Sequence, residues 1–164
     1  MAEADLYDPV LVKLAEQFSG TVGGNAYLET SAKGFTEQIK AAIPPNRDIL
    51  FKFLNRKPDI LGFVAREYRK DFITVEIKEK SLKLDDVYQA KMYKEVFGAR
   101  YGFLVSAAPI PEELKRLCKA TVSILRSIDD GSFRFLAIAQ FFPRHGFIDW
   151  FEENPFENDY FWKP

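Results

Sequence analysis

Residues 58–79, PDILGFVAREYRKDFITVEIKE, decide the fold of this chain. Two runs rich in β-branched and apolar residues, 59–65 and 72–79, flank a charged segment at 66–71, which predicts two strands joined by a turn. Side chains alternate across a strand, so Glu76 and Lys78 project from one face of the second strand, and Ile77 projects from the other. The pattern predicts one apolar face that packs under a helix and one face that carries an acid and an amine.

The segments around these strands predict a central mixed β-sheet flanked by helices on both faces. Helices are expected at 8–18, with Asp8 as N-cap, and at 34–43, 85–97 and 111–127. Further strands are expected at 25–31, 101–106 and 133–142. The helix at 85–97 ends before Gly98 and would connect two parallel strands. Residues 48–54, DILFKFL, are ambiguous between helix and strand.

The length and composition are those of one globular domain. The chain has 164 residues, of which 47% are hydrophobic and 29% are charged. We expect a single domain over residues 1–164, with a core at about 8–128 and a C-terminal strand and aromatic tail at 129–164. The aromatic tail either packs on its own domain or offers a surface to a partner.

The scarcity of cysteine and histidine excludes several kinds of site. Cys118 and His145 are each the only residue of their type, so a disulfide within the chain, a cysteine-held zinc or iron–sulfur site and a multi-histidine metal site are all excluded. The acidic start lacks the features of a signal peptide, and no apolar run reaches the ~18 residues of a membrane helix. We therefore expect a cytoplasmic protein without a membrane partner.

The net charge of −1 weakly opposes an avid, sequence-blind nucleic-acid binder, because phosphates are normally neutralised by a basic surface. Basic residues nevertheless cluster at 66–70 and at 78–83. Each cluster is either solvated surface charge or part of a track for phosphates, and the sequence leaves both interpretations open.

Asp59 changes the interpretation of the Glu76–Lys78 pair. A lone Glu-x-Lys is most often a structural ion pair, but Pro58-Asp59 opens the preceding strand. If the two strands pair through the turn, Asp59 and Glu76 can reach one point. Two carboxylates with room for water suit Mg²⁺, and the backbone carbonyl of Ile77 is a natural third ligand.

This combination resembles the active-site motif of the PD-(D/E)xK nuclease superfamily, on Pro58-Asp59 and Glu76-Ile77-Lys78. Residues 89–93, QAKMY, resemble the Gln-x-x-x-Tyr element of its branch of RecB-type exonucleases, and Holliday-junction resolvases belong to the same superfamily. Gln89 and Tyr93 would share one helix face. The resemblance covers residues 58–106. It implies a restriction-endonuclease-like α/β fold and a deoxyribonuclease that depends on Mg²⁺ or Mn²⁺.

The resemblance also implies roles for individual residues. Asp59 and Glu76 would hold the metal, and Lys78 would orient or deprotonate the attacking water. The family often adds a carboxylate from its first helix, for which Glu16 is the candidate and Glu29 the alternative. The expected contacts to nucleic acid are Gln89, Tyr93, Lys80 and Lys83. Asp85 and Asp86 would cap a helix rather than bind metal. Many relatives act as dimers, so a homodimer is a further expectation.

Two other interpretations remain open at this point. The chain could be a binding module for nucleic acid or a protein, with the nuclease fold but without turnover. It could also be an unrelated α/β domain in which Glu76 and Lys78 form an ordinary pair. The last interpretation predicts that Asp59 and Glu76 point to different places.

Overall fold

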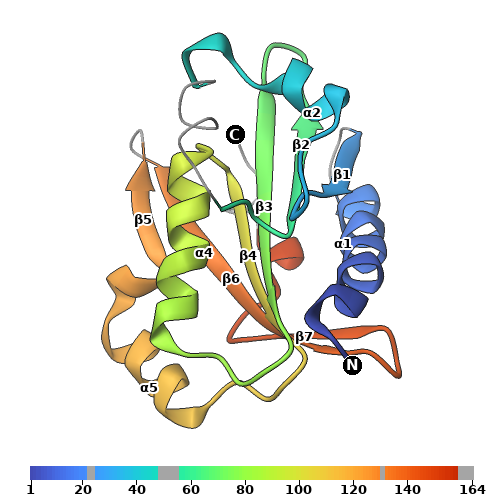
Figure 1. Ribbon diagram of the computed structural model, residues 1–164. Helices are drawn as coiled ribbons and strands as arrows, with labels where there is room; N and C mark the ends of the chain where they lie inside the picture. Colours follow the sequence, from blue (N-terminus) through green and yellow to red (C-terminus); the bar gives the residue numbers. More distant parts are fainter. Residues whose placement is uncertain (22–24, 48–55, 130–131, 159–164) are drawn as a thin grey trace.

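A computed structural model describes residues 1–21, 25–47, 56–129 and 132–158 (Figure 1). In these residues, seven strands form a sheet in the order β1-β2-β3-β4-β6-β5, and β7 pairs with β6 as well. The strands are β1 Ala26–Thr30, β2 Ile60–Ala65, β3 Lys70–Lys78, β4 Tyr101–Ser106, β5 Arg126–Asp129, β6 Ser132–Phe142 and β7 Phe147–Trp150. Strands β1, β2 and β3 pair antiparallel, whereas β3, β4 and β6 pair parallel, so the sheet is mixed.

Helices cover both faces of the sheet (Figure 1). They are η1 Glu3–Leu6, α1 Tyr7–Thr21, α2 Glu37–Ala42, η2 Pro45–Arg47, α4 Leu84–Val96, α5 Glu112–Ala120, η3 Val122–Ile124 and η4 Pro155–Glu157. On one face, α1 buries Val10, Leu14 and Phe18 against Ile73, Val75 and Ile77 of β3. On the other face, α2, α4 and α5 pack on the opposite side chains of the same strands. The expected mixed sheet between two helical layers is confirmed.

The central elements lie where the sequence predicted them. Strands β2, β3 and β4 match the predicted segments to within two residues, and α4 connects the parallel strands β3 and β4. Gly98 follows α4 with a φ of 58°, the left-handed conformation that favours glycine after a helix. All six residues of β4 are buried, as expected for a strand covered on both faces.

The predicted helix at 111–127 is wrong in its second half. Helix α5 ends at Ala120, and the residues that follow form η3 and then β5, which pairs with β6 as a hairpin. Thr121 and Val122 are β-branched residues with weak helix propensity, and the pairing of β5 outweighs the helical pattern. Leu114 and Cys118 are buried as expected, but Leu117 is 39% exposed.

Smaller differences occur at the ends of the chain. The single turn η1 leads directly into α1, so Asp8 lies in the first turn of α1 and is not its N-cap. Strand β7 was not predicted. Residues 48–54, Tyr160, Phe161 and Trp162 lie outside the described residues. Trp150 and Phe156 of the aromatic tail pack on the domain's own core, and Phe156 is 6% exposed.

Candidate active site

The register of β2 and β3 brings Asp59 and Glu76 together. Ile60 pairs with Val75 and Leu61 with Thr74. Continued by one residue, this antiparallel register sets Asp59 opposite Glu76. Directly opposed residues place their side chains on the same face of a sheet, with Cβ atoms about 5 Å apart. The two carboxyl groups interact electrostatically, as expected for neighbours, and both residues are buried.

Hydrogen bonds hold Asp59 in place at the start of β2. Its Oδ2 accepts from the backbone N–H of Ile77 at 2.7 Å, and its backbone carbonyl accepts from the N–H of Ser31 at 2.8 Å. The Ser31 hydroxyl donates to the Pro58 carbonyl at 2.7 Å. Burial raises the pKa of Asp59, against the opposing effects of the hydrogen bonds from Ile77 and Tyr7. The carboxylate is therefore fixed in position but poorly compensated in charge.

The backbone carbonyl of Ile77 lies opposite Pro58, which affects how this carbonyl can be hydrogen-bonded. The Lys78 carbonyl accepts from the Ala107 N–H, so the backbone groups of Lys78 face β4 and those of Ile77 face β2. The register sets Pro58 opposite Ile77, and proline has no N–H to donate. Pro58 therefore cannot donate to the Ile77 carbonyl, as another residue in its place could. The Pro-Asp pair thus provides a carboxylate and removes the usual cross-strand donor to a neighbouring backbone oxygen.

Glu76 is 4% exposed and only partly hydrogen-bonded. Its Oε1 accepts from Lys78 Nζ at 2.8 Å, whereas its buried Oε2 has no partner in the described part of the chain. Burial and the charge of Asp59 raise the pKa of Glu76 to about 7, although Lys78 opposes this shift. The buried Oγ1 of Thr74, on the same strand face, also has no partner within the described residues. Two buried oxygen atoms on this face of β3, Glu76 Oε2 and Thr74 Oγ1, therefore lack hydrogen-bond partners among the described residues.

Lys78 is the cation of the group. Burial lowers its pKa, but the hydrogen bond to Glu76 and the charges of Glu76, Glu3 and Asp59 have the larger combined effect, so the pKa of Lys78 is raised. In the protein without metal, Lys78 is a proton donor and a positive charge, not a base.

Two residues of the N-terminal segment reach the group and were missed by the sequence analysis. The Tyr7 hydroxyl hydrogen-bonds the Asp59 carboxylate, and its pKa is raised by burial and then by Asp59. Glu3 interacts electrostatically with Lys78 and Asp59, and burial raises its pKa. Both lie before the predicted start of the first helix. The available signal was their i, i+4 spacing, which places two polar side chains on one face of a helical segment.

The structure does not bring the two predicted additional carboxylates to this group. Glu16 is an exposed side chain on α1 that pairs with Lys13 at 3.5 Å. Glu29 is buried but hydrogen-bonds Thr36, the N-cap of α2, accepting from its hydroxyl at 2.6 Å and from its N–H at 3.2 Å. Glu3 is the additional carboxylate near Asp59. In the described residues, no group of three or more His, Cys, Asp or Glu is arranged to hold a metal ion.

Helix α4 carries both residues of the Gln-x-x-x-Tyr segment, and Tyr93 interacts with the carboxylates. Gln89 Nε2 donates to the Tyr93 hydroxyl at 3.5 Å, a long contact. Tyr93 is 1% exposed and interacts electrostatically with Glu76 and Asp59. Burial raises the pKa of Tyr93. The tyrosine therefore lies in the electrostatic environment of the two carboxylates, but its burial does not suit the expected contact with nucleic acid.

The lysines predicted to contact nucleic acid lie in the segment that joins β3 to α4. Lys80 is an exposed side chain, 3.9 Å from Glu79, and Lys83 is also exposed. The Lys83 N–H donates to Asp86 at 2.8 Å, so Asp86 caps α4, one of the roles considered for it. Lys80 and Lys83 thus follow Lys78 on an exposed segment near the carboxylates.

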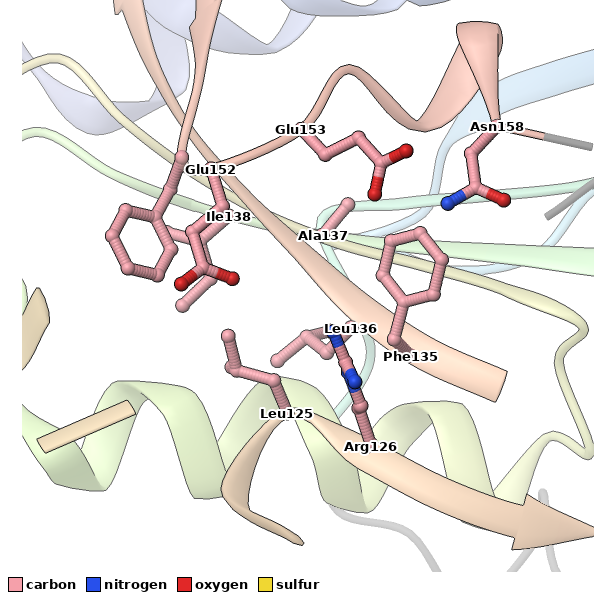
Figure 2. Close-up of a pocket in the computed structure, with 10 residues that line it drawn as sticks. Leu125, Arg126, Phe135, Leu136, Ala137, Ile138, Glu152, Glu153 and Asn158 are labelled. Atoms are coloured by element: carbon pink, nitrogen blue, oxygen red, sulfur yellow. The ribbon is translucent and has the colours of Figure 1, made fainter. Parts of the chain in front are cut away.

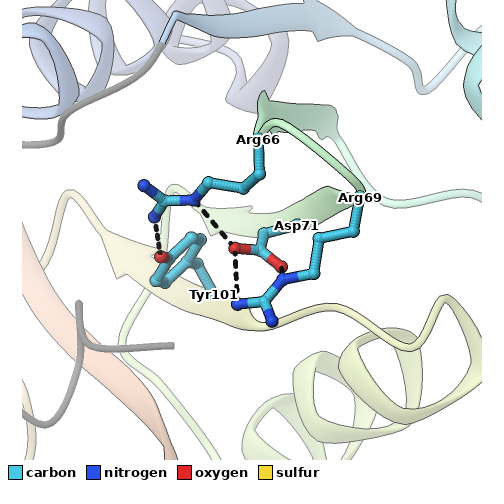
Figure 3. A network of polar contacts seen from close by, with 4 residues as sticks. All are labelled: Arg66, Arg69, Asp71 and Tyr101. Carbon is cyan, nitrogen blue, oxygen red and sulfur yellow. Dashed lines mark hydrogen bonds and ion pairs between the residues drawn. The ribbon is translucent and has the colours of Figure 1, made fainter.

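The basic cluster at 66–70 has a different role. Arg66 and Arg69 both hydrogen-bond Asp71, and Arg66 also donates to the Tyr101 hydroxyl at 3.0 Å (Figure 3). Lys70 Nζ lies over the ring of Phe63, 5.4 Å from its centre. This network lies at the end of β3 opposite to Glu76. The two arginines are held by the protein itself, which favours the structural interpretation of this cluster.

No protein-family model, curated protein or solved structure matches this chain. No helix in the described ranges has the length and apolar character needed to span a membrane. The interpretation of the site rests on its own residues and their geometry.

Proposed function

We propose that this chain is a metal-dependent nuclease with a restriction-endonuclease-like fold, and that it hydrolyses phosphodiester bonds in DNA. The catalytic residues would be Asp59, Glu76 and Lys78. The observation that carries this proposal is the buried Oε2 of Glu76, which has no hydrogen-bond partner in the described part of the chain, in a carboxyl group that interacts electrostatically with Asp59. Two neighbouring buried acids that are only partly compensated destabilise the fold unless a cation joins them.

The residues present fit Mg²⁺ or Mn²⁺. Asp59, Glu76 and the Ile77 carbonyl would supply oxygen ligands, and Mg²⁺ prefers oxygen and keeps several waters of its own. A site built from two carboxylates and one carbonyl is therefore sufficient without a third acid. A bound divalent ion would lower the pKa of a water and neutralise charge on the phosphate.

The residues of the chain would act mainly by position and charge. Lys78, held by Glu76 with a raised pKa, would donate a hydrogen bond to the attacking water or to the phosphate oxygens. The Tyr7 hydroxyl and the Ile77 N–H would fix the orientation of Asp59. The exposed Lys80 and Lys83, together with Gln89, would contact the nucleic acid near the reacting phosphate. Tyr93 is buried and would line the site without contacting the nucleic acid.

A binding module without turnover is the second candidate. The near-neutral charge and the absence of a three-acid group among the described residues favour it. This alternative predicts that the chain binds nucleic acid or a protein while neither Mg²⁺ nor Mn²⁺ binds at Asp59 and Glu76. Metal binding and cleavage therefore separate the two candidates.

The test uses labelled single-stranded, duplex and four-way-junction DNA, with Mg²⁺, with Mn²⁺ and with a chelator. We expect metal-dependent cleavage, lowered at least about 100-fold by Asp59→Ala, Glu76→Ala or Lys78→Ala in folded protein. Lys78→Arg should also fail, because a guanidinium is bulkier and planar. Glu16→Ala, which removes an exposed carboxylate, is the matched control and should cut normally. Cleavage that survives both the chelator and all three alanine substitutions would overturn the assignment.

A further inference from the structure

The outer edge of β6 has a gap. Strand β5 pairs with residues 132–135 of β6, and β7 pairs with residues 139–142, so residues 136–138 have no strand beside them on that edge. A cavity of about 400 Å³ opens at the gap. Figure 2 shows Leu125 and Arg126 on one side of this cavity, Glu153 and Asn158 on the other, and β6 between them.

The backbone of β6 faces this cavity with its hydrogen-bonding groups. The Leu136 N–H donates to the Leu125 carbonyl at 2.7 Å, and the Ile138 carbonyl accepts from the Phe151 N–H at 2.9 Å. The N–H and C=O of one strand residue point to the same side. The Leu136 carbonyl and the Ile138 N–H therefore also point into the gap, where a continuous antiparallel ladder would pair them with Leu125 and Phe151.

Neither expected partner completes the ladder among the described residues. The Leu125 N–H donates to the Val122 carbonyl at the end of η3. The Phe151 carbonyl accepts from the Glu153 N–H at 2.9 Å, in a tight turn that holds Glu152 at a φ of 64°. Such turns are rare and strained for a residue other than glycine.

The Leu136 carbonyl and the Ile138 N–H are therefore left without the cross-strand partners that a continuous ladder would give them. Leu136 is 1% exposed and Ile138 is 2% exposed. Buried backbone groups are paired in the great majority of native proteins, so the Leu136 carbonyl and the Ile138 N–H require a ligand or ordered water. The acceptor and the donor face the same way from residues two apart, a spacing that suits a ligand with a donor and an acceptor side by side.

The surroundings limit the ligand further. Strands β5 and β7 occupy the edge on both sides of the gap, so an extended peptide could not continue along β6. The apolar side chains of Leu125, Phe135 and Phe151 suit the faces of a flat ring. Glu152 and Glu153 outnumber Arg126 at the cavity, which disfavours a phosphate group.

We propose that this cavity binds a purine base or nucleoside, recognised by the Leu136 carbonyl and the Ile138 N–H. An adenine edge has an amino donor beside a ring nitrogen acceptor, which complements this pair. The cavity is separate from the Asp59–Glu76 group, since β6 lies two strands, or about 10 Å, from β3. The proposal does not depend on nuclease activity.

The test is a titration of the ¹⁵N-labelled full chain with adenosine, followed by the amide resonance of Ile138. We expect a saturable shift of this resonance with adenosine. The shift should be lost with N6,N6-dimethyladenosine, which keeps the ring but lacks the donor, and weakened with adenosine 5′-monophosphate. The substitution Leu125→Trp fills the cavity and should abolish the shift, whereas Glu76→Ala should leave it unchanged.

Three results would overturn the proposal. The first is an Ile138 resonance that does not respond to adenosine. The second is equal affinity for adenosine and its dimethyl analogue, which would show that the donor is not recognised. The third is a response that disappears in Glu76→Ala, because the ligand would then occupy the other site. The analogue comparison uses the unmodified chain, so it remains decisive if Leu125→Trp does not fold.

Discussion

The two ends of the β2–β3 hairpin hold buried acids in opposite circumstances. At one end, Asp71 is 7% exposed and both of its oxygens are paired: Oδ1 accepts from Arg69 at 2.8 Å and Oδ2 from Arg66 at 3.1 Å. At the other end, Glu76 is buried to a similar degree, yet one of its oxygens has no partner among the described residues. Asp71 and Glu76 are therefore similarly buried, and they differ in how many hydrogen-bond donors reach their carboxylate oxygens.

The electrostatics follow the same division. The hydrogen bond and charge of Asp71, together with Tyr101, raise the pKa of Arg66 despite the opposing effect of burial. At the other end, burial and Asp59 raise the pKa of Glu76 to about 7, and Lys78 does not reverse this shift. A closed network of this kind stabilises a hairpin, whereas an under-compensated pair of acids is suited to receive a cation. This difference is the physical basis for placing the site at Glu76 and not at Asp71.

A large effect on stability is expected from Asp71→Ala. This substitution leaves the half-buried guanidinium of Arg66 without its carboxylate, and we expect a loss of about 3 kcal/mol in the free energy of unfolding. Denaturant unfolding measures the loss, with Glu67→Ala at the exposed turn as the control. Cleavage per folded molecule should be unchanged. An unaltered stability would show that the closed network does not hold the hairpin.

A second prediction concerns how the free energy of unfolding depends on pH because of Glu76. Folding raises the pKa of Glu76 from an ordinary 4.5 to about 7, so the folded chain binds a proton more readily than the unfolded chain between these values. Stability without metal should therefore fall as the pH rises from about 4.5 to 7, by about 3 kcal/mol for this group. The glutamine in Glu76→Gln does not titrate. At pH 8 this variant should therefore be more stable than the wild-type chain by about 3 kcal/mol.

The measurement is denaturant unfolding of both proteins across this pH range, with a chelator present. Glu16→Gln, at an exposed carboxylate, should follow the wild-type curve. Adding Mg²⁺ at pH 8 should narrow the gap between wild type and Glu76→Gln, because the ion stabilises only the protein that binds it. Parallel pH curves for wild type and Glu76→Gln would mean that Glu76 is adequately compensated without metal.

The sequence was sufficient to predict the elements that carry the acids. The alternation of apolar and polar residues around Glu76 and the turn residues between the runs specified two paired strands, and the structure pairs them in the register that opposes Asp59 to Glu76. The pairing of Arg66 and Arg69 with Asp71 was not predictable, because it depends on which side chains the turn brings together. The sequence therefore left the cluster at 66–70 open between two interpretations.

The third carboxylate and the gap in β6 were beyond the sequence for different reasons. Glu3 lies in the single turn η1 and Tyr7 begins α1, both before the predicted start of the first helix, and Glu16 had the better helical context. The gap at residues 136–138 arises because β5 replaces the second half of a predicted helix, and because the Phe151 carbonyl turns away from Ile138. Both depend on contacts between segments distant from each other in the chain, which local patterns do not encode.

The smallest effect on stability is expected from Thr74→Val. This substitution tests whether buried polar atoms on the strand face of Glu76 lack hydrogen-bond partners. The Thr74 hydroxyl is buried without a partner in the described residues, so its replacement by a methyl group of similar shape removes a desolvated polar atom and no hydrogen bond. We expect stability without metal to stay level or to rise by up to about 1 kcal/mol. The matched variant Ser31→Ala breaks the hydrogen bond to Pro58 and should lose about 1 kcal/mol. A loss for Thr74→Val as large as that for Ser31→Ala would show that the hydroxyl is satisfied in solution, and that this face of β3 has less unmet acceptor capacity than its contacts indicate.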